Sequence, residues 1–404
     1  MITSTERFLS GSGRNMRRSA IREILKVLQK PGMISFAGGL PAPETFPIED
    51  LREIAIEVLD QSGAECLQYG TTEGDPVLRK TLVERYNKMG FNIGLENLII
   101  TTGSQQAIDL VTRIFIDPGD YVLCGLPSYL GAINTFLIYG AKLKGIALDK
   151  DGMKAEELEE TIASLKEYGR KIKFIYIIPD FQNPSGITIP ERRRRQIIDL
   201  AEKYDLLIIE DSPYREVRFE GEPQKMMYEL DNTGRVITIC TFSKILAPGF
   251  RVGWVIGNPL LLDRIVMAKQ TSDLCTSSFV QRIIARYIEK GLLEVNLQKT
   301  ISLYHQRRDL MIDCLRKYMP ESVSWTEPEG GLFLFVTLPA GHDTESIFEK
   351  ALEQNVAFVS GSTFFCNDSG RNTMRLNFSF SNNDEIAEGI RRLANVVREQ
   401  MNTA

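Results

Sequence analysis

The stretch from Val236 to Trp254 reads VITICTFSKILAPGFRVGW and is the most informative part of the chain. Its first residues are apolar or β-branched, as in a strand that is buried on both faces. Two hydroxyl residues and Lys244 follow, then a Pro-Gly turn, and then Arg251 at the start of a second apolar run. A lysine at the end of a buried strand is costly unless something compensates its charge.

One compensation for the charge of Lys244 is chemical, because a lysine amine condenses with an aldehyde to form a Schiff base. The hydroxyls of Thr241 and Ser243 and the guanidinium of Arg251 would suit a phosphate close by. Lysine, hydroxyls and arginine together point to a pyridoxal-phosphate site at the end of this strand.

Short apolar runs alternate with amphipathic stretches from about Asn97 onward. Continuous Val, Ile and Leu runs with helices between them predict a largely parallel sheet that is covered on both faces. In such sheets, ligands lie beyond the carboxyl ends of the strands. We expect strands at 98–102, 121–124, 173–178, 206–209 and 236–240, and helices at 104–115, from about 129, and at 190–204.

A second region begins near Leu297, after a long helical stretch. Its apolar runs and amphipathic segments predict a smaller α+β domain. We therefore expect an N-terminal arm or helix near the active site at 1–40, a large cofactor-binding domain at 41–296 and a small C-terminal domain at 297–404. The expected strands of the small domain are 331–338, 356–359 and 374–379, and its helices are 344–354 and 384–401.

The composition excludes several classes of function. The 404 residues are 43% hydrophobic and 25% charged, as in an ordinary soluble protein, and the net charge of -5 gives no general attraction to nucleic acid or to acidic membranes. We interpret the run Arg192–Arg195 as a solvated helix face, not a nucleic-acid site. The chain has two histidines, His305 and His342, and six scattered cysteines, so we expect no metal site and buried free thiols. Without a signal peptide or a membrane-spanning run, we expect a cytoplasmic protein.

Polar residues recur at the expected strand ends. Ser104 opens a helix, where free N–H groups and the helix dipole suit a phosphate, although it could also be a plain N-cap. Tyr129 could stack on a pyridine ring or serve packing. Asn183 lies in a turn and could donate to a phenolate oxygen or stabilise the turn.

Two charged residues interrupt apolar strands. Asp211, after Glu210, could keep a pyridine nitrogen protonated, or it could belong to an acidic helix N-terminus. Arg375 could bind a substrate carboxylate bidentately with its guanidinium fork, and a structural ion pair is the alternative. The co-occurrence of these signals in this order, each at a strand end, is more specific than any one of them.

Taken together, these motifs resemble the fold type I pyridoxal-phosphate aminotransferases of class I and II, and in particular the branch of 2-aminoadipate and kynurenine aminotransferases. The resemblance covers nearly the whole chain, from ISFAGGLPAPE at 34–44 to the C-terminal helix. It implies an α/β fold with a mainly parallel seven-stranded sheet between helices, plus the smaller α+β domain. It also implies pyridoxal 5′-phosphate as the cofactor.

The resemblance implies a role for each residue around the cofactor ring. Lys244 would carry the internal aldimine and shuttle the proton between the substrate and the cofactor. Asp211 would bind the pyridine nitrogen, and Tyr129 would stack on the ring. Asn183 and Tyr214 would bind the phenolate oxygen.

The phosphate of the cofactor would be held by a second group of residues. By resemblance these are Ser104, Gln105, Ser243 and Arg251. Tyr69 matches a residue that reaches the phosphate of the partner subunit's cofactor, which implies a homodimer with shared active sites.

The substrate would be held by residues from both ends of the chain. Arg375 would bind the α-carboxylate with the backbone of Gly39 and with Asn183. Arg22 matches an arginine that binds acidic side chains in this branch, although a solvent-facing arginine is an equal alternative. Thr241 departs from the pattern, which usually has serine there.

The activity implied by the resemblance is transfer of an amino group from an L-amino acid to a 2-oxo acid in a ping-pong mechanism. The expected donors are 2-aminoadipate, aromatic amino acids or kynurenine, and branched-chain amino acids, and the expected acceptor is 2-oxoglutarate. Another fold type I enzyme, a C–S lyase or decarboxylase, is the alternative. A transcription regulator with an aminotransferase-like domain is disfavoured, because we find no room for a DNA-binding domain before Ser35.

Overall fold

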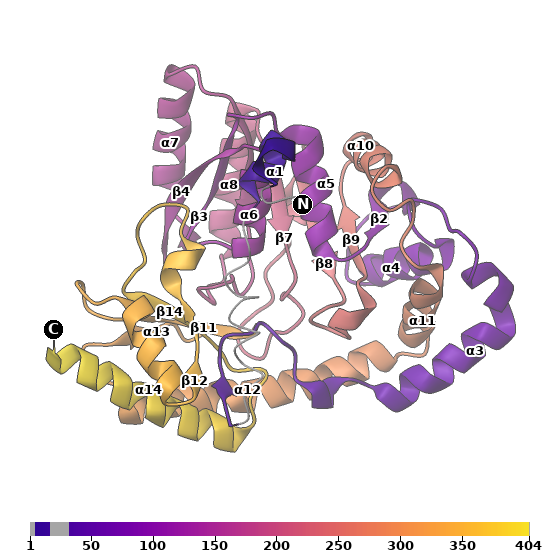
Figure 1. Ribbon diagram of the computed structural model, residues 1–404. Coiled ribbons are helices and arrows are strands. Elements are labelled where there is room, and N and C mark those ends of the chain that lie inside the picture. The colour runs from indigo at the N-terminus through magenta and orange to yellow at the C-terminus, as the bar shows by residue number, and fades with distance from the viewer. Residues whose placement is uncertain (1–4, 17–31, 404) are drawn as a thin grey trace.

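The computed structural model describes residues 5–16 and 32–403, and its largest element is an eight-stranded sheet (Figure 1). From one edge to the other, the strands are β2 (Leu98–Thr101), β9 (Gly253–Ile256), β8 (Val236–Thr241), β7 (Leu207–Asp211), β6 (Ile172–Ile177), β3 (Tyr121–Leu126), β4 (Lys142–Asp149) and β5 (Gly152–Met153).

The sheet is parallel from β8 to β4, as the apolar runs predict. Strand β9 runs antiparallel to both of its neighbours, β2 and β8, and β5 forms a short hairpin with β4. The predicted mainly parallel sheet is confirmed, with the two-residue β5 as one strand more than the predicted seven. Because β8, β7, β6 and β3 are parallel, their carboxyl ends meet at one edge of the sheet.

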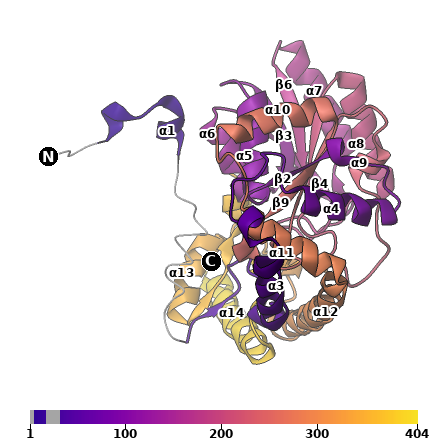
Figure 2. The same ribbon diagram turned by 90° about the vertical axis from the view of Figure 1, so that its right-hand side faces the viewer.

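Helices cover both faces of the sheet, as Figure 2 shows from the side. Alternate side chains of a strand enter opposite layers. Phe174 and Tyr176 of β6 pack toward α5 and α6, whereas Ile175 and Ile177 pack toward α7 and α8. One layer contains α5 (Ser104–Phe115), α6 (Leu130–Ile138) and α10 (Pro259–Gln270), and the other contains α7 (Ala155–Glu167), α8 (Glu191–Tyr204) and α9 (Met227–Leu230).

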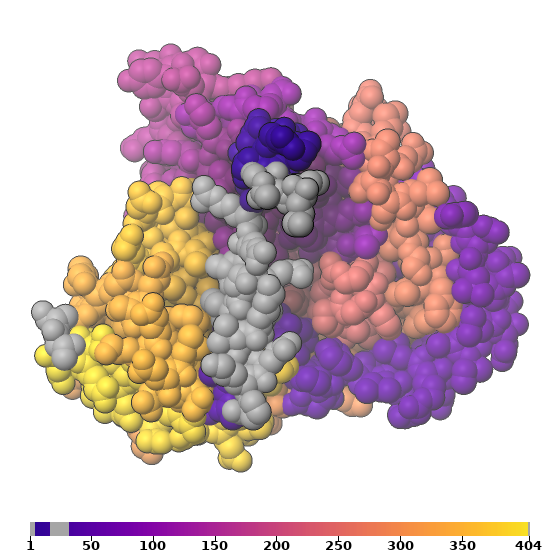
Figure 3. Space-filling view, viewed as in Figure 1, coloured from indigo at the N-terminus to yellow at the C-terminus, as the bar shows by residue number. Residues whose placement is uncertain are grey.

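A second, antiparallel sheet forms the C-terminal region, which is orange to yellow in Figure 3. Its strands in order are β10 (Ser324–Trp325), β11 (Phe333–Thr337), β14 (Thr373–Asn377) and β13 (Val359–Ser360). The helices of this region are α12 (Leu292–Tyr318), α13 (Thr344–Glu353) and α14 (Asn383–Thr403). The predicted α+β region is therefore present, and the long α12 runs along the base of the molecule against α14 (Figure 1).

The remaining elements join the two regions. Strand β1 (Ile34–Ser35) pairs in parallel with β12 (Val356–Ala357), so the chain just before the predicted large domain lies against the C-terminal region. Helices α3 (Ile48–Cys66) and α4 (Pro76–Lys88) pack on α11 (Ser278–Glu289), and α1 (Gly11–Asn15) contacts α6. The domain boundaries at 41 and 297 stay predictions.

The arginine run on α8 is only half solvated. Arg192 and Arg195 are exposed, but Arg193 and Arg194 are buried. Arg194 contacts Asp180 at 2.7 Å between Nη2 and Oδ1, and both side chains are almost fully buried. The interpretation of the run as a solvated face is therefore wrong for two of its members, because these two lie on the side of the helix that packs on the sheet. Among the described residues, no helix is both long and apolar enough to cross a membrane.

Candidate active site

A cavity of about 470 Å³ lies at the carboxyl ends of the parallel strands, with Phe333 and Arg375 of the C-terminal region on its wall. Tyr69 does not line this cavity, and Arg22 lies outside the described residues. Of the predicted site residues, the structure brings together Gly39, Ser104, Gln105, Tyr129, Asn183, Asp211, Tyr214, Ser243, Lys244, Arg251 and Arg375.

Asp211 ends β7 and is buried, and its two carboxylate oxygens differ in their contacts. Tyr176 donates its hydroxyl to Oδ2 at 2.6 Å, whereas Oδ1 has no hydrogen-bond partner among the described residues. Burial raises the pKa of Asp211 to about 7, and the bond from Tyr176 opposes this rise. The free Oδ1 is therefore an acceptor that can meet a ring N–H in the cavity.

The two acidic residues at the end of β7, Glu210 and Asp211, have different surroundings. Glu210 accepts hydrogen bonds from the backbone N–H groups of Met227 and Tyr228 and from the hydroxyl of Thr238. The acidic helix N-terminus that we considered for Asp211 is thus formed by Glu210 at the start of α9. Asp211 remains directed to the cavity.

Lys244 is partly buried, and its amine reaches across the cavity. Nζ donates to the backbone carbonyl of Gly39 at 2.7 Å. Burial, and to a smaller extent the positive charges of Arg375 and Arg251, together lower the pKa of Lys244 to about 8. More of this lysine is therefore neutral amine near pH 7 than of a solvated lysine.

One end of the cavity is built to hold an anion. Gly103, with φ +78°, occupies the N-cap of α5, so Ser104 is the first helical residue and the plain N-cap interpretation of it is wrong. The first N–H groups of a helix have no partner within the helix. A Cβ on Gly103 would lie 2.5 Å from Nη2 of Arg251, so glycine lets the guanidinium approach. Arg251 in turn donates to the hydroxyl of Ser243, which also accepts from Thr241 at 2.9 Å.

Aromatic and amide side chains also line the cavity. Tyr129 donates its hydroxyl to Oε1 of Gln105 at 3.4 Å, and Gln105 donates to Thr135 at 2.8 Å. Asn183 donates from Nδ2 to the hydroxyl of Tyr214 at 3.3 Å. Burial raises the pKa of Tyr214 above its ordinary value, so this phenol stays protonated and is itself a donor.

Arg375 of β14 is buried without a carboxylate partner among the described residues. Nη1 donates to Oδ1 of Asn183 at 2.9 Å, and Nη2 donates to the carbonyl of Ala37 at 2.6 Å. The guanidinium lies over the rings of Phe333 and Phe364, at 4.1 and 4.9 Å from their centroids. The structural ion pair that we considered for this arginine is therefore not formed, and its charge is available to an anion in the cavity.

Sequence reasoning missed three residues of this site. Tyr176 holds Asp211, and Phe333 and Phe364 hold Arg375. A tyrosine inside the apolar run 173–178 is a usable signal, because a buried hydroxyl needs a partner. The two phenylalanines offer no such signal, since apolar residues in and beside strands are ordinary core residues.

A second hollow, of about 720 Å³, lies between the β4–β5 turn and residues 326–329. None of the predicted site residues lines it. Its carboxylates are already paired, as in the contacts of Arg193 with Asp149 and of Arg316 with Glu327. We therefore assign the chemistry to the smaller cavity.

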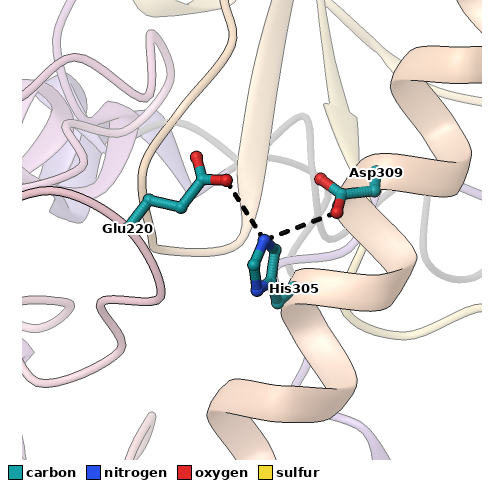
Figure 4. A group of neighbouring side chains, drawn as sticks. All are labelled: Glu220, His305 and Asp309. Carbon is teal, nitrogen blue, oxygen red and sulfur yellow. Dashed lines mark hydrogen bonds and ion pairs between the residues drawn. The ribbon is translucent and has the colours of Figure 1, made fainter.

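One group of side chains outside the cavity has the composition of a metal site. Nε2 of His305 lies 3.2 Å from Glu220 and 3.4 Å from Asp309 (Figure 4). Arg308 contacts both carboxylates at 2.7 Å, and the imidazole stacks on Phe219 with 5.1 Å between the ring centroids. Because the guanidinium of Arg308 already contacts both carboxylates, we interpret the group as a link between α12 and the loop that carries Glu220.

Comparisons with known proteins agree over almost the full length of the chain. A family model described as aminotransferase class I and II matches residues 32–393. The chain is 46% identical over 397 residues to aromatic-amino-acid aminotransferase 1 of Thermococcus litoralis, which covers 98% of this chain and 95% of that protein. Among solved structures, it is similar to Pyrococcus horikoshii kynurenine aminotransferase in complex with PMP, with a TM-score of 0.95, 46% identity and 99% of each chain covered. It is also similar to the α-aminoadipate aminotransferase of Thermus thermophilus complexed with N-(5′-phosphopyridoxyl)-L-leucine, with a TM-score of 0.92, 36% identity and coverage of 99% and 100%.

Proposed function

The chain belongs to the class I and II aminotransferases, which depend on pyridoxal phosphate, and on this premise we propose that it transfers the amino group of an L-amino acid to a 2-oxo acid in the cavity around Lys244. One observation carries the proposal. A lysine with a lowered pKa, an unpartnered oxygen of Asp211 and a buried Arg375 without a carboxylate partner face the same space.

The residues of the cavity fit pyridoxal phosphate. When bound, this cofactor supplies an aldehyde that condenses with amines and a ring that accepts the electrons released at the substrate's α-carbon. We propose that Oδ1 of Asp211 binds the ring nitrogen and that Tyr129 stacks on the ring. The donors Asn183 and Tyr214 would bind the phenolate oxygen. The phosphate would lie against Ser104, Gln105, Ser243 and Arg251 at the N-terminus of α5.

Lys244 would move the proton of the reaction. With a pKa of about 8, its amine can take a proton from the α-carbon of the substrate and return it near neutral pH. Asp211 would stay ionised and hold the proton on the ring nitrogen. The low polarity that raises the pKa of Asp211 also strengthens such an ion pair.

Arg375 would orient the substrate. Its guanidinium, held between Phe333 and Phe364, would bind the α-carboxylate together with Asn183 and the backbone of Gly39. A substrate carboxylate would supply the negative charge that Arg375 lacks in its protein contacts. This contact would place the α-carbon within reach of Lys244.

We propose 2-oxoglutarate as the acceptor, and aromatic amino acids, kynurenine, 2-aminoadipate or branched-chain amino acids as donors. The apolar side chains of the cavity wall, Leu40, Leu130, Ile178 and Phe333, suit aromatic and aliphatic donors. An acidic side chain would need a further cation. Among the described residues, the cations that line the cavity are Lys244, Arg251 and Arg375. The proposed roles of these three residues toward the cofactor and the α-carboxylate leave none of them for an acidic side chain. The candidate for the further cation is Arg22, whose placement lies outside the described residues.

A panel of amino donors with 2-oxoglutarate tests the activity. We expect a 2-oxo acid to form from the donor only when the acceptor is present, and Lys244→Ala to lose nearly all turnover. The exposed Lys171→Ala serves as the control and should keep full activity. Product formation without an acceptor would instead indicate a lyase or decarboxylase, and full turnover by Lys244→Ala would refute the role of the lysine.

The same panel tests the specificity. If Arg22 binds an acidic side chain, Arg22→Ala should lose 2-aminoadipate while aromatic and aliphatic donors keep their kcat/KM. An equal loss with every donor would show that Arg22 does not read the side chain.

We also propose a homodimer with shared active sites. Tyr69 is 79% exposed and its neighbour Leu67 is 71% exposed, so both side chains are accessible to a partner subunit. A dimer would bring Tyr69 to the phosphate of the partner subunit's cofactor.

A further inference from the structure

Among the described residues, the carboxylate of Asp211 is held by a single side chain. The hydroxyl of Tyr176 lies 2.6 Å from Oδ2, and the exposed fractions are 0% for Tyr176 and 2% for Asp211. Oδ1 has no partner among the described residues, and Asp211 is one of the residues that line the cavity. One oxygen is thus tied to the protein and the other is left for a ligand.

Tyr176 is rigidly placed for this contact. It lies on β6, in the middle of the sheet, and pairs in register with Ile209 of β7 and Cys124 of β3. Its ring makes an edge contact with Phe136, with 5.3 Å between the centroids. Burial raises the pKa of Tyr176 well above its ordinary value, so the phenol stays protonated and acts as a donor.

We propose that Tyr176 is a positioning residue that directs Oδ1 of Asp211 toward the ring nitrogen of pyridoxal phosphate and keeps this carboxylate ionised by donating a hydrogen bond to Oδ2. The inference rests on the role of Asp211 in the proposed function. It adds a residue that never touches the cofactor but sets the protonation of its ring.

The physical reason is that Asp211 and the ring nitrogen compete for one proton. Asp211 and the ring nitrogen share a proton across their contact, and it resides on the nitrogen only if the carboxylate stays ionised. In apolar surroundings, a carboxylate that loses a hydrogen-bond donor takes up a proton more readily. Without the hydroxyl of Tyr176, the shared proton should therefore move from the ring nitrogen toward Asp211.

Tyr176→Phe removes the hydroxyl and keeps the ring. Pyridoxal phosphate labelled with ¹⁵N in the ring should show, by NMR of the bound enzyme, a shift toward the value of the unprotonated pyridine. Tyr287→Phe is the matched control, because Tyr287 is also fully buried and its hydroxyl has no hydrogen-bond partner among the described residues. The control should leave the ¹⁵N shift unchanged.

Affinity gives a second readout that does not depend on turnover. The dissociation constant of pyridoxal phosphate from the apoenzyme, measured by fluorescence titration, should rise about tenfold to a hundredfold in Tyr176→Phe, as for loss of a hydrogen bond to a charged group. In Tyr287→Phe it should stay at the wild-type value. An unchanged constant in Tyr176→Phe would contradict the inference.

Asp211→Asn separates failure of this inference from failure of the proposed function. If Asp211→Asn changes the ¹⁵N shift and Tyr176→Phe does not, the role of Tyr176 is overturned and the role of Asp211 stands. If Asp211→Asn leaves the shift unchanged, both are overturned.

A further variant covers the case in which Tyr176→Phe does not fold. Incorporation of 3,5-difluorotyrosine at position 176 keeps the packing and makes the hydroxyl a stronger donor. The ¹⁵N shift should then move further toward the protonated value, and a shift in the opposite direction would overturn the inference.

Discussion

Lys244 shows how burial and neighbouring charge prepare a residue for chemistry. Arg375 and Arg251 lower its pKa in addition to burial, and among the described residues no carboxylate forms an ion pair with it. With a pKa of about 8 in place of 10.5, about a tenth of the lysine is neutral amine at pH 7, whereas a solvated lysine would have far less. A carboxylate in contact would have had the opposite effect.

The pH dependence of cofactor capture tests this account. The rate at which apoenzyme attaches pyridoxal phosphate covalently, trapped by borohydride and measured by mass spectrometry, should rise with pH to a midpoint near the pKa of about 8. Arg375→Gln should move the midpoint to higher pH, because a like charge is removed. Arg371→Gln, which changes an exposed arginine four residues earlier, should not move it. A midpoint that falls in Arg375→Gln would contradict the assigned cause.

The N-terminus of α5 contributes a glycine, Gly103, to the proposed anion site. Gly103 has two properties that a larger residue would lose, a φ of +78° and room for Arg251 beside its Cα. Gly119 has a similar φ of +96° but open space around the position of a Cβ. A comparison of substitutions at the two glycines therefore separates the effect of backbone strain from the effect on the shape of the anion site.

Substitution of these glycines by alanine should give two different results. Both variants should lose about 1–2 kcal/mol of unfolding free energy, since L residues are strained at positive φ. Only Gly103→Ala should also bind pyridoxal phosphate more weakly, by about tenfold or about 1.4 kcal/mol. Thermal unfolding and fluorescence titration of the apoenzyme measure the two effects. Equal affinities in both variants would argue against an anion site at this helix end.

Helix α8 carries adjacent arginines in opposite surroundings. Arg194→Met would leave Asp180 buried without its closest partner, and such a loss costs about 3–5 kcal/mol. Arg195 pairs with Glu191 in an exposed contact, so Arg195→Met should cost at most about 1 kcal/mol. Urea unfolding of both variants measures the difference. Similar midpoints would show that the buried pair adds little stability.

The proposed dimer makes each active site depend on two chains. Lys244→Ala removes the lysine from a subunit's own site, whereas Tyr69→Ala would weaken the site of its partner. A hybrid of the two variants contains one site with both residues and one site with neither. Shared active sites in the dimer can therefore be tested by mixing the two variants.

Equal amounts of the two variants, unfolded and refolded together at a cofactor concentration too low for the weakened site, should recover about a quarter of wild-type activity, because half of randomly formed dimers are hybrids with one intact site. Each variant refolded separately is the control. Sedimentation velocity should give a dimer in all three samples. No recovery in the mixture would contradict shared sites.

Strand ends and turn motifs were predictable from sequence because they are local properties. The helix at 104–115 matches α5, and the apolar runs match β2, β3, β6, β7 and β8 to within a few residues. In parallel strands the carboxyl ends share one edge, so the convergence of Asp211, Asn183 and Lys244 also followed from the pattern. The sequence thus determined which residues could meet at this cavity.

Contacts between distant segments were decided only by the folded chain. The antiparallel direction of β9, the burial of Arg194 and the rings around Arg375 depend on which faces pack together, and hydrophobic periodicity gives no partner for a face. The same holds for Tyr176 and Asp211, which lie 35 residues apart and meet on neighbouring strands at 2.6 Å. Burial then sets the pKa values of Asp211 and Lys244, because the removal of water is a property of the whole molecule.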